Sequence, residues 1–333
     1  MTQAIAVLGA GAIGSVVGAR LHESGINVRL IGRAAQIDAI QTKGLLVKVK
    51  TEARLVHLPA ATTLTGTADI ILLTVKSQDV QDACRTIAAL QSDATVVTMQ
   101  NGVRSDAEAA DILGRGRIVG CVLNISATYL EPGVVEQNTT GLFQVGAPFP
   151  ESKARVDAVL ALLSLAIRTE YVPDIARSRW TKLMANLNNA IMAITGLPIG
   201  KALRHPGLTR LSIATIREGV KTAQLGGYGL DQSRRARTFR LMSTLPMPLS
   251  YLVFGRRLAG NFPPESTYGP STLQSLQRHT SSELDYLNGE IVTLGERIGR
   301  PTPYNAGLLE QGRAVFATGR HLSPEELLQQ FRF

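Results

Sequence analysis

The sequence is poor in residues that hold metal ions or disulfides. It has 333 residues but only two cysteines, Cys84 and Cys121, and five histidines. The histidines are scattered, with no HxxxH pair and no Cys/His cluster, so we expect no metal site. Both cysteines stand among apolar residues, as buried small side chains do, which argues against a disulfide. A metalloenzyme and a disulfide scaffold are therefore not expected.

Signals for secretion and membrane insertion are also lacking. The first three residues lead directly into an apolar segment, without a basic region or a small-residue cleavage site. The most apolar stretch of the second half, 183–198, contains Asn186, Asn188 and Asn189. A lipid-exposed helix would carry these amides only at a high cost in free energy. We expect a cytoplasmic protein with no membrane helix.

Acidic residues are fewer than basic ones, which leaves a formal net charge of +9. A nucleic-acid site would need a clustered basic face, with aromatic side chains to stack on bases. The densest basic run, 234–240, holds four arginines but a single aromatic residue, Phe239, which favours a solvated helix face. We expect no nucleic-acid partner. Positive potential also attracts anionic cofactors and carboxylate substrates, so the charge suits an enzyme that uses them.

The pattern of apolar residues divides the chain in two. In the first half, short β-rich runs alternate with helical patterns, which is typical of βαβ units and a parallel sheet. After Pro173 the strand pattern ends and long helical periods follow. We predict an α/β fold, with a Rossmann-type dinucleotide-binding domain over 1–172 and an all-helical C-terminal domain over 173–333. Expected strands are 4–8, 27–31, 70–75, 95–98, 118–123 and 170–172, with 133–137 and 142–146 as an antiparallel extension of the same sheet. Expected helices are 152–167, 179–194, 208–225, 271–297 and 306–317.

A glycine turn follows the first predicted strand. Its residues are Gly9, Ala10, Gly11, Ala12, Ile13 and Gly14, a GxGxxG pattern that opens a helix. In such a turn the first glycine permits the tight bend and the second lets the backbone approach a pyrophosphate. The third allows close packing of helix on strand, while the helix N-terminus attracts the anion. The alternative is a glycine-rich turn without a ligand. We predict a dinucleotide site.

Three residues at the ends of later strands extend this site. NAD enzymes usually carry an acid after the second strand, where this chain has Arg33, so we predict NADPH as the cofactor. An ordinary exposed arginine is the alternative. Lys76 and Asn101 follow the strands 70–75 and 95–98, at the edge where open parallel sheets bind ligands. Each alone would be a common loop residue, but together they favour a functional edge.

Polar residues recur along the expected helix 179–194. In a continuous helix, residues four apart differ by about 40° and residues seven apart by about 20°, so Lys182, Asn186 and Asn189 would share one stripe. Such a stripe either faces solvent or lines a cleft. Asparagines are poor helix formers, which favours the cleft. Reduction of a ketone by hydride also needs a proton, and a lysine with a lowered pKa can donate it. Lys182 is therefore the candidate proton donor.

Two further candidates lie near the expected helix 271–297. Ser271 begins it and is a candidate N-cap, but its hydroxyl could also bind a substrate carboxylate. Glu283 could be a surface acid or part of the site. The residues alone do not separate these alternatives.

Taken together, these motifs resemble the ketopantoate reductase family (2-dehydropantoate 2-reductase) over nearly the whole chain. The resemblance rests on the glycine turn with Arg33, Val75-Lys76-Ser77, Gln100-Asn101-Gly102, Glu131-Pro132-Gly133, Trp180-Thr181-Lys182-Leu183 with Asn186, Pro270-Ser271 and Glu283-Leu284-Asp285-Tyr286-Leu287-Asn288-Gly289.

The resemblance implies NADPH-dependent reduction of 2-dehydropantoate to pantoate, a step of pantothenate biosynthesis, by enzymes that are often homodimers. It implies that Lys182 donates the proton and that Asn186 and Ser271 bind substrate. Asn101 would contact both cofactor and substrate. Ala127 and Glu283 would lie against the nicotinamide half of NADPH, and Glu283 would also steady the substrate or Lys182.

The substrate half departs from the family pattern. Ala190 stands where the family commonly has a second asparagine, with Asn189 beside it as a possible replacement. Gly200 stands at the position of a further substrate-contacting asparagine, and Ser275 replaces an acid. The expected function is therefore a 2-oxo acid reductase with 2-dehydropantoate as its first candidate substrate. The alternatives are a reductase of another branched 2-oxo acid and a non-catalytic NADP-sensing protein.

Overall fold

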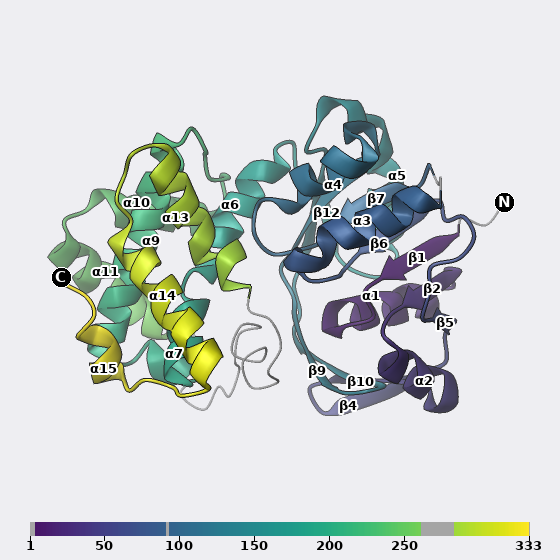
Figure 1. Cartoon of the computed structure of the whole chain (residues 1–333), viewed down its shortest axis with the longest axis horizontal. Helices are drawn as coiled ribbons and strands as arrows, with labels where there is room; N and C mark the ends of the chain where they lie inside the picture. Colours follow the sequence, from purple (N-terminus) through teal and green to yellow (C-terminus); the bar gives the residue numbers. More distant parts are fainter. Residues whose placement is uncertain (1–3, 91–92, 261–282, 333) are drawn as a thin grey trace. The chain divides into compact units, whose positions relative to one another are not determined.

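The computed structural model describes residues 4–90, 93–260 and 283–332 (Figure 1). The chain forms two compact units, here the N-terminal unit (1–178) and the C-terminal unit (179–333). Helix α6 (Ile175–Asn186) begins in the first unit and ends in the second. The predicted fold class is confirmed, since an α/β unit with a parallel sheet precedes helices only in the described part of the C-terminal unit.

An eight-stranded sheet forms the centre of the N-terminal unit. Strand β1 (Ile5–Leu8) lies between β2 (Val28–Ile31) and β6 (Ile70–Leu73) and is parallel to both. The chain therefore moves outward from β1 first on one side and then on the other, which makes β1 the switch point where such sheets bind ligands. The full order is β12-β11-β8-β7-β6-β1-β2-β5, with β5 Ala60–Ala61, β7 Thr95–Thr98, β8 Ile118–Leu123, β11 Phe143–Gly146 and β12 Thr169–Tyr171.

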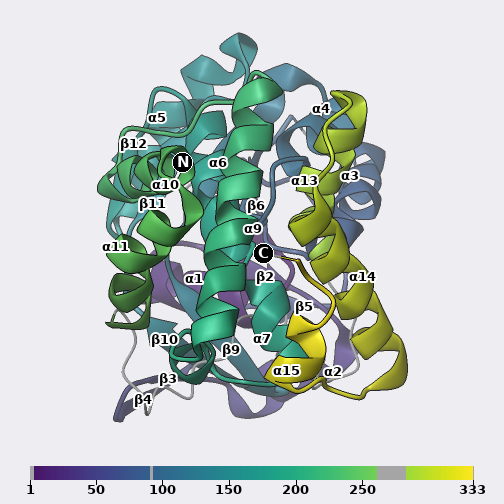
Figure 2. The ribbon, with the colours of Figure 1, turned by 90° about the vertical axis from the view of Figure 1, so that its left-hand side faces the viewer.

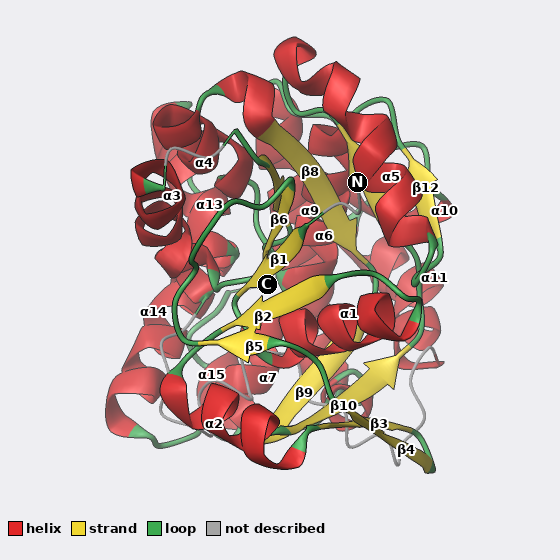
Figure 3. Cartoon of the chain, turned by 90° about the vertical axis from the view of Figure 1, so that its right-hand side faces the viewer, coloured by secondary structure: helices red, strands yellow, loops and turns green. Residues whose placement is uncertain are grey.

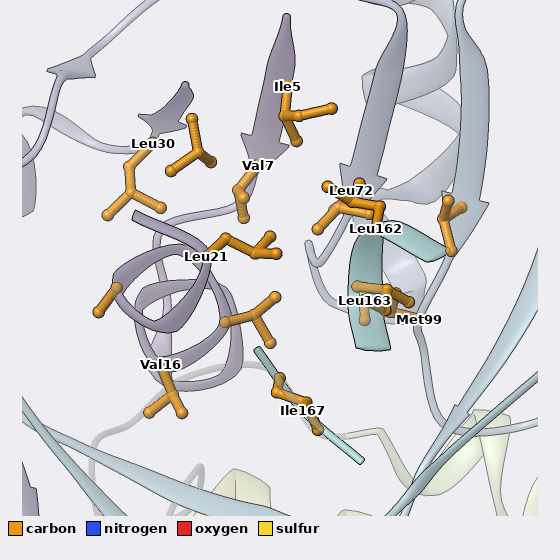
Figure 4. Packing of buried hydrophobic residues seen from close by; sticks show 14 of the residues in the cluster. Ile5, Val7, Val16, Leu21, Leu30, Leu72, Met99, Leu162, Leu163 and Ile167 are labelled. Atoms are coloured by element: carbon orange, nitrogen blue, oxygen red, sulfur yellow. The ribbon is translucent and has the colours of Figure 1, made fainter. Parts of the chain in front are cut away.

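Helices cover both faces of this sheet (Figure 3). Because neighbouring side chains of a strand point to opposite faces, Val7 of β1 joins the core beneath α1 (Ala12–Glu23), while Ala6 joins the other core. Figure 4 shows Leu21 of α1 beside Val7 of β1. The first core also holds α2 (Ala34–Lys43) and α5 (Val156–Ser164), which follows η3 (Pro150–Arg155). The second core holds α3 (Val80–Ala89) and α4 (Ser105–Leu113). The short helix η1 (Ser77–Asp79) precedes α3, and η2 (Arg115–Arg117) follows α4.

A second sheet of four strands was not predicted. Its order is β4-β3-β10-β9, with β3 Leu45–Val49, β4 Glu52–Val56, β9 Ser126–Glu131 and β10 Val134–Thr139. The prediction that 133–137 extends the main sheet is wrong, because β10 pairs in parallel with β3 and antiparallel with β9. The prediction for 142–146 is confirmed, since β11 pairs antiparallel with β8 in the main sheet.

The C-terminal unit is built around α9 (Pro206–Leu225). Figure 2 shows α10 (Arg234–Thr244) and α11 (Met247–Gly260) on one side of α9 and α13 (Asn288–Arg297) and α14 (Pro303–Thr318) on the other, and each of the four contacts it. Leu208 and Leu211 of α9 share a buried core with residues of α7, α14 and α15. The remaining elements are α7 (Asn189–Thr195), α8 (Ile199–Ala202), η4 (Leu284–Tyr286) and α15 (Pro324–Leu328).

Two predicted helices are interrupted. The stretch 179–194 is divided between α6 and α7, and the turn is closed by a short-range bond from the Ile191 amide to the Asn188 carbonyl, 3.0 Å long. Of the predicted helix 271–297, residues 271–282 lie outside the described part. In the rest, the backbone of Leu287, with φ −118° and ψ −92°, leaves the helical region between η4 and α13. Leu187 and Leu287 are buried, so the apolar pattern continues across each break. Periodicity alone therefore does not show where these helices are interrupted.

Both cysteines are buried free thiols, as predicted. Burial, followed by the nearby Glu108 carboxylate, raises the pKa of the Cys84 thiol to about 11. At pH 8 roughly one Cys84 in a thousand is then a thiolate, which is the reactive form. We expect iodoacetamide to label Cys84 at pH 8 only after unfolding in urea, as read by peptide mass spectrometry. Rapid labelling of the native protein would contradict this burial.

Among the described residues no helix is long and apolar enough to cross a membrane. The same residues contain no group of three or more histidine, cysteine or acidic side chains that could hold a metal ion.

Candidate active site

The glycine turn has the backbone of a nucleotide-binding turn. Gly9 has φ +120°, and a side chain there would place its Cβ 2.6 Å from the Val75 amide nitrogen. A Cβ at Gly14 would lie 2.1 Å from the Gly9 carbonyl oxygen, so only glycine permits this approach of helix to strand. Gly11 differs from both, because a Cβ there would meet no atom within 4 Å. The space over Gly11 is open to a ligand.

The N-terminus of α1 is suited to an anion. Gly11 is its N-cap, no side chain caps it, and its first turn carries no acidic residue. The first amides of a helix have no partner within the helix and lie at the positive end of its dipole. A pyrophosphate can therefore accept hydrogen bonds there without repulsion from a carboxylate of this turn. The residues present fit a dinucleotide.

Side-chain hydrogen bonds hold the neighbouring loops at the same edge of the sheet. Thr74, directly after β6, donates from Oγ1 to the Gly9 carbonyl over 2.8 Å. Gln100, after β7, donates from Nε2 to the carbonyls of Leu73 and Val75, over 2.8 and 3.1 Å. Ser77 Oγ donates to the Asn101 carbonyl over 3.1 Å. The structure thus brings the segments of Lys76 and Asn101 to the edge that carries the glycine turn.

Arg33 lies on a neighbouring segment of this edge. It follows β2 and is the N-cap residue of α2, with an exposed side chain. The preceding Gly32 passes the glycine turn closely, since a Cβ there would lie 2.6 Å from the Cβ of Ala10. Arg33 makes no side-chain hydrogen bond or ion pair within the described residues. Its guanidinium is therefore available to an external anion.

Ala127 lies elsewhere in the N-terminal unit. It belongs to β9 of the second sheet, is partly buried, and pairs with Gln137 of β10. It does not end a strand of the main sheet, so its contact with the cofactor stays a prediction. Gln36, which the sequence analysis did not single out, connects this sheet to the nucleotide edge. Its amide donates to Ser15 Oγ over 3.2 Å and accepts from the Gly133 amide over 2.7 Å.

Lys182 and Asn186 lie four residues apart on α6, so they project from similar directions of one helix. Both are partly exposed, whereas Leu183 and Met184 between them are buried. Asn189 is the first residue of α7, after the break. The predicted stripe assumed a continuous helix, which the structure interrupts between Asn186 and Asn189. Lys182 and Asn186 thus form a polar pair on α6.

A buried polar network fixes the backbone directly after Asn186. Asn288 of α13 donates from Nδ2 to the Leu187 carbonyl over 3.2 Å and to Asn305 Oδ1 over 3.0 Å. Asn288 and Asn305 are fully buried. Glu283, a buried residue five positions before Asn288, is the N-cap residue of η4. Asn288 belongs to a motif quoted from the sequence, but nothing in the sequence showed that its side chain bonds to the backbone between α6 and α7.

Glu218 of α9 anchors this network. Its carboxylate accepts hydrogen bonds from the backbone amide of Tyr304, over 3.1 Å, and from both the backbone amide and the side chain of Asn305, each over 2.8 Å. Glu218 thereby takes the place of a missing side-chain cap at the N-terminus of α14. Burial raises the pKa of Glu218, while the bonds from Asn305 and Tyr304 and the charge of Arg300 oppose that shift.

Of the predicted site residues, Ser271 lies outside the described residues. The others fall into two groups. The glycine turn, Arg33, Lys76 and Asn101 share one edge of the main sheet in the N-terminal unit, with Ala127 on the second sheet. Lys182, Asn186, Asn189 and Glu283 belong to the C-terminal unit.

A parallel sheet with a glycine turn at its switch point, followed by a helical unit, defines the class of dinucleotide-binding oxidoreductases. Residues 5–148 match the family model described as ketopantoate reductase PanE/ApbA, and residues 174–315 match the model of its C-terminal part. The chain belongs to the ketopantoate reductase family and is an oxidoreductase of the 2-dehydropantoate 2-reductase type. The predicted resemblance is confirmed.

Similar proteins cover nearly the whole chain. A 2-dehydropantoate 2-reductase of Pyrococcus horikoshii is 30% identical over 90% of this chain and 93% of its own. One from Archaeoglobus fulgidus is 28% identical over 94% and 98%. The crystal structure of a PanE/ApbA family ketopantoate reductase from Ralstonia eutropha JMP134 superposes with a TM-score of 0.80 and 28% identity, covering 95% of this chain and 99% of its own. D-mandelate dehydrogenase with NADH and anilino(oxo)acetate shares the fold, with a TM-score of 0.82 and 23% identity over 94% and 98%.

Proposed function

We propose that this protein reduces a 2-oxo acid to the 2-hydroxy acid with NADPH, and that 2-dehydropantoate, which yields pantoate, is its substrate. The observation that carries the proposal is the open space over Gly11 at an uncapped helix N-terminus, in a chain of the ketopantoate reductase family. Relatives named 2-dehydropantoate 2-reductase support the choice of substrate.

The residues at the edge of the main sheet would hold the dinucleotide. The glycine turn would bind its pyrophosphate, while Lys76 and Asn101 would line the same edge. Arg33 would pair with the 2′-phosphate that distinguishes NADPH from NADH, because a guanidinium forms strong forked bonds to phosphate. When bound, the nicotinamide supplies the hydride for the carbonyl carbon. NADH in the related D-mandelate dehydrogenase makes this cofactor preference the point that needs testing.

The C-terminal unit would supply the proton. Lys182 donates it from Nζ to the carbonyl oxygen as the alcohol forms, and solvent then restores the ammonium group. Asn186, one helical turn away, would bind the substrate, together with Asn101 and Ser271. Glu283 would lie against the nicotinamide and steady Lys182 or the substrate. Asn189, the first residue of α7, is a further candidate to bind the substrate.

A substrate panel tests the proposal. Purified protein with NADPH is offered 2-dehydropantoate, 2-oxoisovalerate, 4-methyl-2-oxopentanoate and benzoylformate, and NADPH oxidation is followed by absorbance. We expect the highest kcat/KM with 2-dehydropantoate. Faster reduction of another 2-oxo acid would move the substrate assignment to that acid. Binding of NADPH with no turnover of any acid would instead favour an NADP-sensing protein, and light scattering of the same sample tests the proposed homodimer.

Replacing Arg33 by alanine should change the preference between the two dinucleotides. We expect the Kd for NADPH to rise about 10- to 100-fold, with little change for NADH, because only NADPH offers a phosphate to the guanidinium. Titration of nicotinamide fluorescence measures both constants. Arg29→Ala is the matched control, since Arg29 is also exposed but lies within β2. Equal weakening of both dinucleotides by Arg33→Ala would contradict this role.

A further inference from the structure

A cavity in the N-terminal unit lies away from the glycine turn. It has a volume of about 450 Å³, and its polar lining includes Arg20 of α1, Gln137 of β10 and Arg168, directly before β12. Arg20 follows Gly11 by nine residues, which places it about 14 Å along α1 from the helix N-terminus. The cavity is therefore separate from the proposed dinucleotide site, and its size is typical of small-molecule sites.

The guanidinium of Arg20 is held in place but incompletely bonded. Its Nη2 donates to Gln137 Oε1 over 2.7 Å. Gln137 is only 3% exposed, and its Nε2 donates to the Thr139 carbonyl over 2.9 Å, so the orientation of its amide is fixed. The Nε of Arg20 is buried without a hydrogen-bond partner. A buried donor of this kind costs free energy until an acceptor is supplied.

The positive charge at the cavity is only partly compensated. Arg168 makes no side-chain hydrogen bond or ion pair within the described residues, and the lining contains no acidic residue. Glu23, one turn after Arg20, pairs with Arg54 over 3.4 Å. Glu170, two residues after Arg168, accepts a hydrogen bond from Gln144 over 2.8 Å. Burial, followed by the nearby Arg54, lowers the pKa of Arg20, while the Glu23 carboxylate opposes this shift.

The rest of the lining is largely apolar. Ile125, Leu142 and Ile167 contribute aliphatic side chains beside the two arginines. Inorganic phosphate would satisfy the guanidinium groups but leave this apolar surface in water. A short aliphatic chain that carries an anionic group would use both parts, because arginine binds carboxylates strongly and each buried methylene adds about 0.8 kcal/mol.

We propose that this cavity is a second anion site, which binds a small organic carboxylate with a short aliphatic chain. The carboxylate lies against Arg20 and Arg168, and the chain lies on Ile125, Leu142 and Ile167. The proposal does not depend on the reductase function.

Calorimetry with hexanoate tests the site. The protein is titrated with hexanoate, inorganic phosphate and 1-hexanol, with and without saturating NADP+. We expect saturable binding of hexanoate in both conditions, and binding of the other two at least tenfold weaker. Lys182→Ala should leave this binding unchanged, which separates the cavity from the proposed substrate site. Phosphate binding as tight as hexanoate binding would overturn the aliphatic part of the proposal.

Substitution of the exposed arginine locates the binding. Arg168→Gln should weaken hexanoate at least tenfold while turnover with NADPH and the 2-oxo acid stays unchanged. Arg235→Gln is the matched control, because it removes one exposed arginine of α10 and should have no effect. Absence of saturable hexanoate binding, or equal binding by Arg168→Gln and the unaltered protein, would overturn the site. Because heat is measured, a protein without reductase activity gives an equally clear answer.

Discussion

Lys182→Ala is expected to lower kcat for 2-oxo acid reduction by about 10²- to 10⁴-fold, the usual contribution of a positioned proton donor. The Kd for NADPH should change little, because Lys182 is not one of the proposed cofactor residues and the lost interaction acts in the transition state. Single-turnover kinetics measures the chemical step, and fluorescence titration measures cofactor binding.

Lys221→Ala is the matched control for this experiment. Lys221 is an exposed lysine of α9 in the same unit, so its removal makes the same change in net charge. We expect its turnover to equal that of the unaltered protein. Unchanged turnover of Lys182→Ala would end the proposed role of Lys182, whereas equal losses in both variants would indicate an effect of charge alone.

Glu218→Ala is expected to destabilise the C-terminal unit by about 3 kcal/mol. The substitution removes the acceptor of three hydrogen bonds and leaves the amides of Tyr304 and Asn305 unsatisfied, each at a cost of about 1–3 kcal/mol before relaxation. Urea unfolding followed by the fluorescence of Trp180 reports on this unit. Glu310→Ala on the exposed side of α14 is the control and should change stability little. An equally small change for Glu218→Ala would show that α14 needs no such cap.

The pH dependence of this effect has a definite sign. Burial raises the pKa of Glu218 in the folded state, so the folded protein holds this proton more tightly than the unfolded chain. The resulting stability is fully present below the unfolded pKa, about 4.3, and is lost as pH rises through the folded pKa. The stability of the unaltered protein relative to Glu218→Gln should therefore fall as pH rises above about 4.3. A relative stability that rises with pH would contradict the raised pKa.

The strands of the main sheet could be predicted because local patterns mark them. Buried apolar runs such as Ile70–Leu73 alternate with helical periods, and parallel strands joined by helices follow one handedness. The second sheet could not be predicted in this way. Its strands β3 and β10 are about ninety residues apart in the chain and pair in parallel, and β4 is largely exposed. Pairing between such distant segments leaves no local signal.

The candidate site could likewise be predicted only in part. The glycine turn was predictable because steric contacts at Gly9 and Gly14 demand glycine at fixed spacing. The break after Asn186 was not, because a tertiary bond from Asn288 supports it from another helix. Apolar periodicity records which side of a helix is buried, but it does not record where the helix stops. The distinction matters for Asn189, whose predicted direction assumed a continuous helix.

The open position of Arg33 has an evolutionary consequence. Its exposed side chain makes no hydrogen bond or ion pair within the described residues, so most substitutions there should cost the fold little. Gly14 cannot vary in this way, because any side chain would meet backbone. Under the role proposed for Arg33, descendants of this chain could change their preference between NADPH and NADH through single codon changes, while the glycine turn stays under strict selection.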